Sequence, residues 1–312
     1  MAELLNSLSA VALILAMAAV GFFCGKVGWL SRENKPFIVR LIINICVPLM
    51  CADNFFNSVT LDMLKGAGPL FLVTLLSLCI TMLLGLLLAR LFRIEHKRYG
   101  GFVVMCALSN SLFIGLPMCT ELFGIEAVPH VMIFYIVNTT FFWTAGALML
   151  RRSGLGKDAR LSPLETARGI LNPPIISLVL CAALVAAGFQ PPHIFLSFAH
   201  YLGSLVTPLS LIYVGFVIYE TGLNNLRLDK TMLAVLAMRF VVAPLVTLAL
   251  CHAFGVEGIQ RGVLTLEAAM PVMTQSVVVS ASVGADERYT AAGLSLTTLA
   301  CFVAVPLLML LV

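Results

Sequence analysis

The sequence predicts an all-α integral membrane protein with ten membrane-spanning helices, arranged as two inverted repeats of five. Three observations lead to this fold class. Of the 312 residues, 61% are apolar and only 11% are charged, whereas soluble domains carry about a quarter charged residues. The charges separate apolar runs of about 20 residues, the length that crosses a hydrocarbon core of roughly 30 Å. The second half of the chain also echoes the first at an offset of about 160 residues.

The apolar runs define the expected spans. In the first half they lie at 7–28, 36–55, 67–92, 99–123 and 128–150, and in the second half at 172–188, 193–219, 230–254, 258–283 and 289–312. The two repeats therefore occupy 1–150 and 172–312, and 151–171 is expected to be a cytoplasmic linker. No basic residue precedes Lys26, so the first run lacks the positively charged start of a secretory signal and is expected to be a retained span.

The basic residues indicate how the helices are oriented. All 19 Lys and Arg residues except Lys65, Arg239 and Arg261 fall in or beside the loops that join spans 1–2, 3–4, 5–6, 7–8 and 9–10. Cytoplasmic loops of membrane proteins carry an excess of basic residues. We therefore expect these loops on the cytoplasmic side and both termini on the external side.

The internal echo keeps one register through five consecutive spans. Gly28 returns as Gly188 and Pro48 as Pro208. Further matched positions are Gly100 and Gly262, Ser109-Asn110 and Met270-Pro271, and Thr139-Thr140 and Thr297-Thr298. An odd number of spans in each half makes the second half enter the membrane from the opposite face, as in the inverted repeats of many transporters. Chance similarity between apolar segments is the alternative.

Two spans are expected to be interrupted near the middle of the membrane. The fourth span carries Ser109, Asn110 and Ser111 ahead of a glycine and Pro117, and the ninth span carries Pro271. Proline removes a backbone donor and clashes with the preceding turn of a helix. Unpaired backbone groups are tolerated at this depth only where they face protein or a wet cavity. If both helices break, their half-helix N-termini favour an anion between them; a simple proline kink is the alternative for either span alone.

Polar residues near these breaks are candidate ligands. Asn44, ahead of Pro48, is expected to face the fourth span, and Asn138 lies inside the fifth. With Ser109, Asn110, Ser111, Pro117, Pro271, Arg239 and Gln275 they form the candidate substrate site. The alternative is that Ser, Thr and Asn only join helices to one another by hydrogen bonds.

Two ionisable residues lie deep in the spans. Arg239 is in the eighth span and Glu267 in the ninth, where each costs about 2.5–3.5 kcal/mol unless it has a partner or water. Arg239 is a candidate to hold a substrate carboxylate. Glu267, with Thr139 and Thr274, is a candidate site for a coupling ion, either H⁺ or Na⁺. The alternative is that Arg239 and Glu267 pair and lock two helices together.

An ordered set of segments resembles the auxin efflux carrier family of permeases, in its bacterial branch of malate or malonate transporters. The matching text is GFFCGKVGWL at 21–30, NICVPL at 44–49, SNSLFIGLPM at 109–118, NPPII at 172–176, TPLSLIYVG at 207–215, MRFVVAP at 238–244, AMPVMTQ at 269–275 and TTLACFVAVP at 297–306. The resemblance covers essentially the whole chain. One departure is Val272, where many members of the family carry a second proline.

This resemblance implies an architecture and a site. It implies a fold similar to sodium/proton antiporters and bile-acid symporters, located in the bacterial cytoplasmic membrane. Helices 1, 2, 6 and 7 would form a scaffold, which can dimerise, and helices 3–5 and 8–10 a transport domain that moves like an elevator. The crossover prolines map to Pro117 and Pro271, and Glu267 is placed like a sodium-binding glutamate of the bile-acid symporters. The long cytoplasmic loop of the plant carriers is absent, so auxin is not the expected cargo.

The expected function is secondary transport of small organic anions such as dicarboxylates. A sodium-coupled symporter, an ion exchanger, a channel or a transporter-like sensor are alternatives within the same fold. An intramembrane enzyme is not expected, because the aspartates all fall in loops or at span ends and no G-x-S-x-G motif occurs. The nine cysteines show no metal-ligand spacing, so no metal or other cofactor is expected, and the small net charge of +4 gives no indication of nucleic acid. The expected partners are the anion and membrane lipid.

Overall fold

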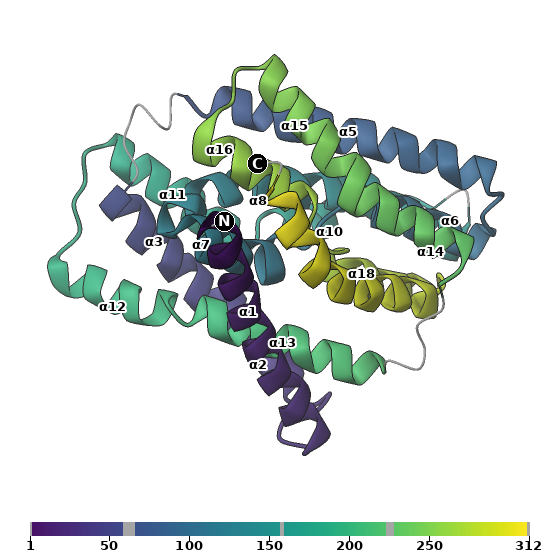
Figure 1. Ribbon diagram of the computed structural model, residues 1–312, viewed down its shortest axis with the longest axis horizontal. Coiled ribbons are helices and arrows are strands. Elements are labelled where there is room, and N and C mark those ends of the chain that lie inside the picture. The colour runs from purple at the N-terminus through teal and green to yellow at the C-terminus, as the bar shows by residue number, and fades with distance from the viewer. Residues whose placement is uncertain (1, 59–65, 157–158, 223–227, 311–312) are drawn as a thin grey trace.

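The protein is described by a computed structural model that covers residues 2–58, 66–156, 159–222 and 228–310, without the side chains of residues 2–11, Ser58 and Thr221. Lys65 and the last two residues of the tenth predicted span lie outside these ranges. Within them the chain is entirely helical, with no strand longer than a single bridge (Figure 1). Six of the helical segments described are long and apolar enough to cross a membrane, and the bent pair Pro163–Ile170 and Pro173–Ala186 is a seventh if it forms one span.

The first half contains the helical elements up to residue 155. They are α1 (Ala2–Lys26), α2 (Lys35–Leu41), η1 (Ile42–Cys46), α3 (Val47–Ser58), α5 (Gly68–Leu91), α6 (His96–Ala107), η2 (Ser111–Gly115), α7 (Leu116–Phe123), η3 (Ile125–Ala127), α8 (Val128–Phe141), η4 (Phe142–Gly146) and α9 (Ala147–Leu155).

The second half contains the elements from residue 163 onward. They are α10 (Pro163–Ile170), α11 (Pro173–Ala186), α12 (His193–Gly203), α13 (Val206–Thr221), α14 (Lys230–Ala237), η6 (Met238–Val242), α15 (Ala243–Ala253), α16 (Gly258–Ala268), α17 (Thr274–Val283) and α18 (Glu287–Leu308).

Three prolines inside predicted spans follow a π-helical turn and do not coincide with a break. Pro48, Pro117 and Pro244 each stand two residues after such a turn, in η1, η2 and η6 respectively. A proline has no N–H for the carbonyl four residues before it. A π turn widens the helix by one residue and lets the chain continue in the same direction. The expectation that Pro117 marks the interruption of the fourth span is therefore wrong: the backbone leaves the helix earlier, at Leu108–Asn110.

The expected cytoplasmic linker 151–171 contains a helix of its own. Helix α10 packs on α8 and η4, where Gly169 lies directly against the indole of Trp143. It meets α11 at an angle of 60°, so the sixth apolar segment begins before residue 172 and is bent there. Asn172 caps the start of α11 by accepting a hydrogen bond from the N–H of Ile175 at 3.2 Å. The apolar pattern missed α10 because only one face of this short helix is apolar.

The helices pack in two groups. Group 1 consists of α1, α2, α3, α11, α12 and α13, and group 2 consists of α5–α9 and α14–α18. In group 1, α1 lies so close to α13 that a Cβ on Gly21 would come within 1.9 Å of the carbonyl oxygen of Ile212, and one on Gly215 within 1.8 Å of that of Ala18. In group 2, a Cβ on Gly100 would come within 2.3 Å of the carbonyl oxygen of Met149. Only glycine permits such backbone contacts.

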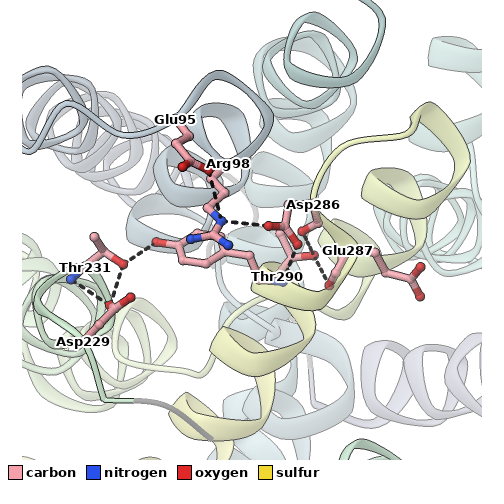
Figure 2. A network of polar contacts seen from close by, with 8 residues as sticks. Glu95, Arg98, Asp229, Thr231, Asp286, Glu287 and Thr290 are labelled. Atoms are coloured by element: carbon pink, nitrogen blue, oxygen red, sulfur yellow. Dashed lines mark hydrogen bonds and ion pairs between the residues drawn. The ribbon is translucent and has the colours of Figure 1, made fainter. Parts of the chain in front are cut away.

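A polar network joins three helices of group 2 at their N-terminal ends (Figure 2). Arg98 on α6 donates to Asp286 at 2.7 Å, and its guanidinium lies 5.2 Å from the centre of the Tyr289 ring on α18. The Tyr289 hydroxyl in turn donates to Thr231 on α14 at 2.9 Å, and Asp229 caps α14. The network therefore ties α6, α14 and α18 into one unit.

Candidate functional site

Both predicted interruptions are present, and the two broken segments cross. Leu108 has an extended backbone, with φ −104° and ψ 133°, and ends α6. Ser109 forms an antiparallel bridge with Val272, and the N–H of Asn110 donates to the carbonyl of Pro271 at 2.8 Å. Pro271 suits this position because it has no N–H that needs a partner. Chain segments 160 residues apart thus meet as a short two-stranded contact inside the protein.

Asn138 on α8 completes the backbone hydrogen bonds of the first broken segment. Its side-chain amide donates to the carbonyl of Ser109 at 2.8 Å and accepts from the N–H of the same residue at 3.3 Å. It also reaches the hydroxyl of Ser111 at 3.3 Å. Asn138 is completely buried. A primary amide carries the same donor and acceptor as a peptide, so it can replace the missing helical partners.

Thr297 on α18 has the corresponding role for the second broken segment. Its hydroxyl accepts from the N–H of Val272 at 3.1 Å and donates to the carbonyl of Gly293 at 2.8 Å. The break in each span is thus supported by a polar side chain from the last long helix of its own half. In the sequence, Thr297 stands out only as part of the internal echo, and it was not among the predicted site residues.

Arg239 holds the C-terminal end of α16. Its Nε donates to the carbonyl of Met270 at 2.9 Å, and its Nη2 donates to the carbonyl of Ala268 at 2.8 Å and also to that of Met270. The side chain is fully buried, and Nη1 has no hydrogen-bond partner among the described residues. The carbonyls at the end of a helix carry partial negative charge, so the guanidinium stabilises this end.

Glu267 lies one residue before the end of α16 and points toward the fourth apolar segment. Its carboxylate is fully buried and packs directly against Gly115, where a Cβ would come within 2.3 Å of Oε1. The thiol of Cys119 donates to Oε1 at 3.6 Å, whereas Oε2 has no hydrogen-bond partner among the described residues. No ion pair joins Glu267 to Arg239 in the part of the chain that the structure describes. The alternative of a locking pair therefore finds no support there.

Two narrow pockets flank the crossing and share Asn110. Asn110 itself donates to the hydroxyl of Thr274 at 3.1 Å. The first pocket is lined by Asn110, Ile114, Tyr213, Val214, Val217, Ile218, Thr274, Leu294, Ser295 and Thr298. The second is lined by Ser109, Asn110, Ser111, Leu112, Phe113, Tyr135, Asn138, Met273 and Gln275. The buried hydroxyls of Ser109 and Ser295 have no hydrogen-bond partner among the described residues. Each pocket has a volume of about 10 Å³, room for about one water molecule in this conformation.

The structure brings most of the predicted site residues together. Seven lie at the crossing or line a pocket: Ser109, Asn110, Ser111, Asn138, Pro271, Thr274 and Gln275. Arg239 and Glu267 flank the crossing without lining either pocket, and Thr139 is buried beside Asn138.

Two predicted site residues lie elsewhere. Pro117 is in the first turn of α7, and Asn44 is exposed on η1, outside both pockets. Tyr213 and Ser295 were not predicted as site residues, because isolated hydroxyls on continuous helices carry no local signal, and Thr298 stood out only as part of the internal echo.

Comparison with known proteins identifies the family of this chain. The family model described as "Membrane transport protein" matches residues 7–309. An uncharacterized transporter of Methanocaldococcus jannaschii is 25% identical over 295 residues, which are 92% of this chain and 93% of that protein. An uncharacterized transporter of Methanothermobacter thermautotrophicus is 24% identical over 306 residues, 97% of each chain. Because the family model spans nearly the whole sequence, this multi-pass membrane protein belongs to the membrane transport protein family.

Proposed function

We propose that the protein is a secondary transporter that moves small organic anions, such as dicarboxylates, across the cytoplasmic membrane. The observation that carries this proposal is the crossing of two interrupted helices, with a pocket on each side and unpartnered buried hydroxyls in both linings. A break of this kind persists in a membrane only where it faces protein or a wet cavity. Sites at broken helices near mid-membrane are typical of secondary transporters.

Helix N-termini supply the attraction for an anion. The apolar helix Ser111–Phe123 and helix α17 both begin at the crossing, and their first turns contribute Ser111 and Thr274 to the pockets. Each N-terminus is equivalent to about half a positive charge, so the two together suit one carboxylate group of the cargo. No Lys or Arg is among the residues that line either pocket. The direct contacts that favour an anion are therefore these two helix ends, and Arg239 is not a direct ligand in this arrangement.

The proposed architecture is ten spans in two inverted repeats. The six long helices, the bent α10–α11 pair and the shorter apolar helices Ala12–Lys26, Ser111–Phe123 and Thr274–Val283 support this count, because each overlaps one predicted span. In the proposed orientation the basic loops face the cytoplasm and both termini are external.

Alternating access of the elevator type is supported by the way the two helix groups are held together. Glu220 binds Arg32 at 2.8 Å and Lys35 at 2.6 Å within group 1, and Arg98 binds Asp286 within group 2. Among the described residues no ion pair joins one group to the other. Group 1 corresponds to the proposed scaffold and group 2 to the proposed transport domain. Each group is tied internally, and the two groups share an apolar core, to which the hydrogen bond from Asn54 of α3 to the carbonyl of Ile125 at 2.8 Å adds a polar contact.

Glu267 is the proposed coupling residue. A buried carboxylate oxygen without a partner is costly unless the group is protonated or binds a cation. The titratable and charged groups near it are Cys119 on α7 and Arg239 on η6. With Arg239 fixed beside it, ionised Glu267 makes the region neutral, whereas protonated Glu267 leaves one net positive charge. Binding of an anion is then favoured when Glu267 carries a proton, which couples the cargo to H⁺.

Flux measurements in proteoliposomes test the proposal. Purified protein should exchange labelled malate, malonate or related carboxylates, and Asn110→Ala should reduce the flux about two- to twelvefold, the value of one hydrogen bond of about 0.5–1.5 kcal/mol. Asn57→Ala, at an exposed asparagine that lines neither pocket, is the matched control and should leave the flux within about twofold. Glu267→Gln should remove the dependence of flux on pH. Absence of flux for every organic anion under every ion gradient would reject the proposal.

A further inference from the structure

The C-terminal end of α16 presents backbone carbonyls of the kind that bind cations. α16 stops at Ala268, and the carbonyls of Ala268 and Met270 point toward α14–α15, where the group that meets them is a side chain and not a backbone N–H. Such carbonyls carry the negative end of the helix dipole. In transporters built from interrupted helices, half-helix C-terminal ends and unwound carbonyls coordinate the coupling Na⁺ or H⁺.

In this protein a guanidinium already occupies that position. Three hydrogen bonds hold Arg239 to the two carbonyls, and the side chain is fully buried. Arginine keeps its charge in proteins, so the group is a permanent monovalent cation. It is also tethered, because its backbone lies in the π turn η6 between α14 and α15.

Two other roles for Arg239 fit the structure less well. A substrate ligand should line a pocket, and Arg239 lines neither. A partner for Glu267 should form an ion pair with it, and the described residues contain none between the two. The remaining role is that the Arg239 guanidinium neutralises the carbonyls of Ala268 and Met270 at the end of α16, as a bound cation would.

We propose that Arg239 is a built-in substitute for a coupling cation, so that the transporter works without Na⁺. The role in coupling rests on the proposed function, whereas the binding of a cation at the end of α16 does not. Removing the guanidinium exposes the carbonyls of Ala268 and Met270, with the carboxylate of Glu267 on the neighbouring residue of α16. Hard oxygen ligands of this kind suit Na⁺. The arginine-free variant therefore gains a dependence on Na⁺ that the natural protein lacks.

Thermal unfolding of the purified protein tests the inference without any transport assay. Natural protein, Arg239→Ala and Arg239→Lys are compared in NaCl, KCl and choline chloride at constant ionic strength. We expect the natural protein and Arg239→Lys to unfold at the same temperature in all three salts. Arg239→Ala should unfold at a lower temperature and recover by several degrees as Na⁺ is raised, because a ligand that binds only the folded state stabilises it.

Two controls separate a cation site from a simple strut. Arg40→Ala removes an exposed charge on α2 and should show no preference among the salts. Adding Glu267→Gln to Arg239→Ala should weaken the Na⁺ effect, because it removes the negative charge on the residue next to Ala268. A strut alone would lower the unfolding temperature equally in all three salts.

Several outcomes would overturn the inference. One is a higher unfolding temperature of the natural protein in NaCl than in choline chloride. This measurement does not depend on whether any variant folds. Another is that the Arg239→Ala variant folds but has the same unfolding temperature in NaCl and in choline chloride. In proteoliposomes, replacing Na⁺ by choline should leave natural flux unchanged. If no anion is transported at all, the proposed function fails, whereas the unfolding data still decide the cation site.

Discussion

At the scale of single residues, Gly115 determines how closely the fourth and ninth apolar segments approach. A Cβ on this residue would lie 2.3 Å and 2.6 Å from the two carboxylate oxygens of Glu267, closer than any real contact. Gly115→Ala must therefore displace the carboxylate, and overpacking of this kind costs about 1–3 kcal/mol. We expect a lower unfolding temperature together with reduced flux. Gly68→Ala is the matched control, because a Cβ there meets nothing within 4 Å; equal stability of the two variants would contradict the expected packing.

Site residues could be predicted from the sequence where the residue type is costly at its position. Polar and ionisable side chains in an apolar helix need partners, so Asn110, Asn138, Arg239 and Glu267 could be singled out from the sequence. Their partners could not be predicted. The backbone carbonyls that Arg239 binds become available only after α16 has ended, and that end is a property of the three-dimensional crossing.

At the scale of helices, Asp286 joins the start of α18 to α6. Its carboxylate accepts from Arg98 at 2.7 Å and from the N–H of Tyr289 at 3.0 Å. Burial raises the pKa of Asp286, but the hydrogen bonds from Arg98 and from the Tyr289 backbone lower it more, so that its pKa lies below the ordinary 3.8. A lowered pKa of a carboxyl in the folded state stabilises the protein at pH values above 3.8, and this stabilisation is lost as pH falls through the folded-state pKa.

Asp286→Asn keeps a good helix cap but removes the charge that pairs with Arg98, so it should destabilise the protein by about 0.2–1 kcal/mol at pH 7, the value of a partly exposed ion pair. The unfolding temperatures of the variant and the natural protein should converge as the pH falls below about 4. Fluorimetric melting in detergent across pH 3–7 measures both. An undiminished difference at pH 3 would mean that the ionised carboxylate is not the stabilising group.

Prolines show how much of the helices the sequence could predict. A proline in a span predicts a lost helical hydrogen bond, but not how the chain responds. Pro48, Pro117 and Pro244 are absorbed by π turns, whereas Pro271 lies in a true break. The difference depends on distant groups such as Asn138 and Thr297, which satisfy an extended backbone where they are present. The bend at Asn172 was missed for the same reason, since it depends on the packing of α10 on α8.

At the scale of the whole molecule, the proposed mechanism requires movement between the two helix groups. Phe113 of η2 and Tyr213 of α13 meet across the boundary, with ring centroids 5.0 Å apart. Phe22 of α1 and Tyr219 of α13 meet at 5.5 Å within group 1. The two aromatic pairs are therefore similar in distance but differ in whether they join moving parts.

Cysteine pairs at these positions, in a background without the nine native cysteines, allow the groups to be joined by a short reducible cross-linker. Cross-linking Phe113→Cys to Tyr213→Cys should abolish flux, and reduction should restore it, because a bond across the boundary prevents sliding. Cross-linking Phe22→Cys to Tyr219→Cys should leave flux within about twofold, since both residues belong to one rigid group. Undiminished flux through fully cross-linked Phe113–Tyr213 protein would rule out relative movement at this boundary, and with it the elevator. The comparison also separates movement from damage, because both pairs replace an aromatic contact on α13 and differ only in the helix to which α13 is joined.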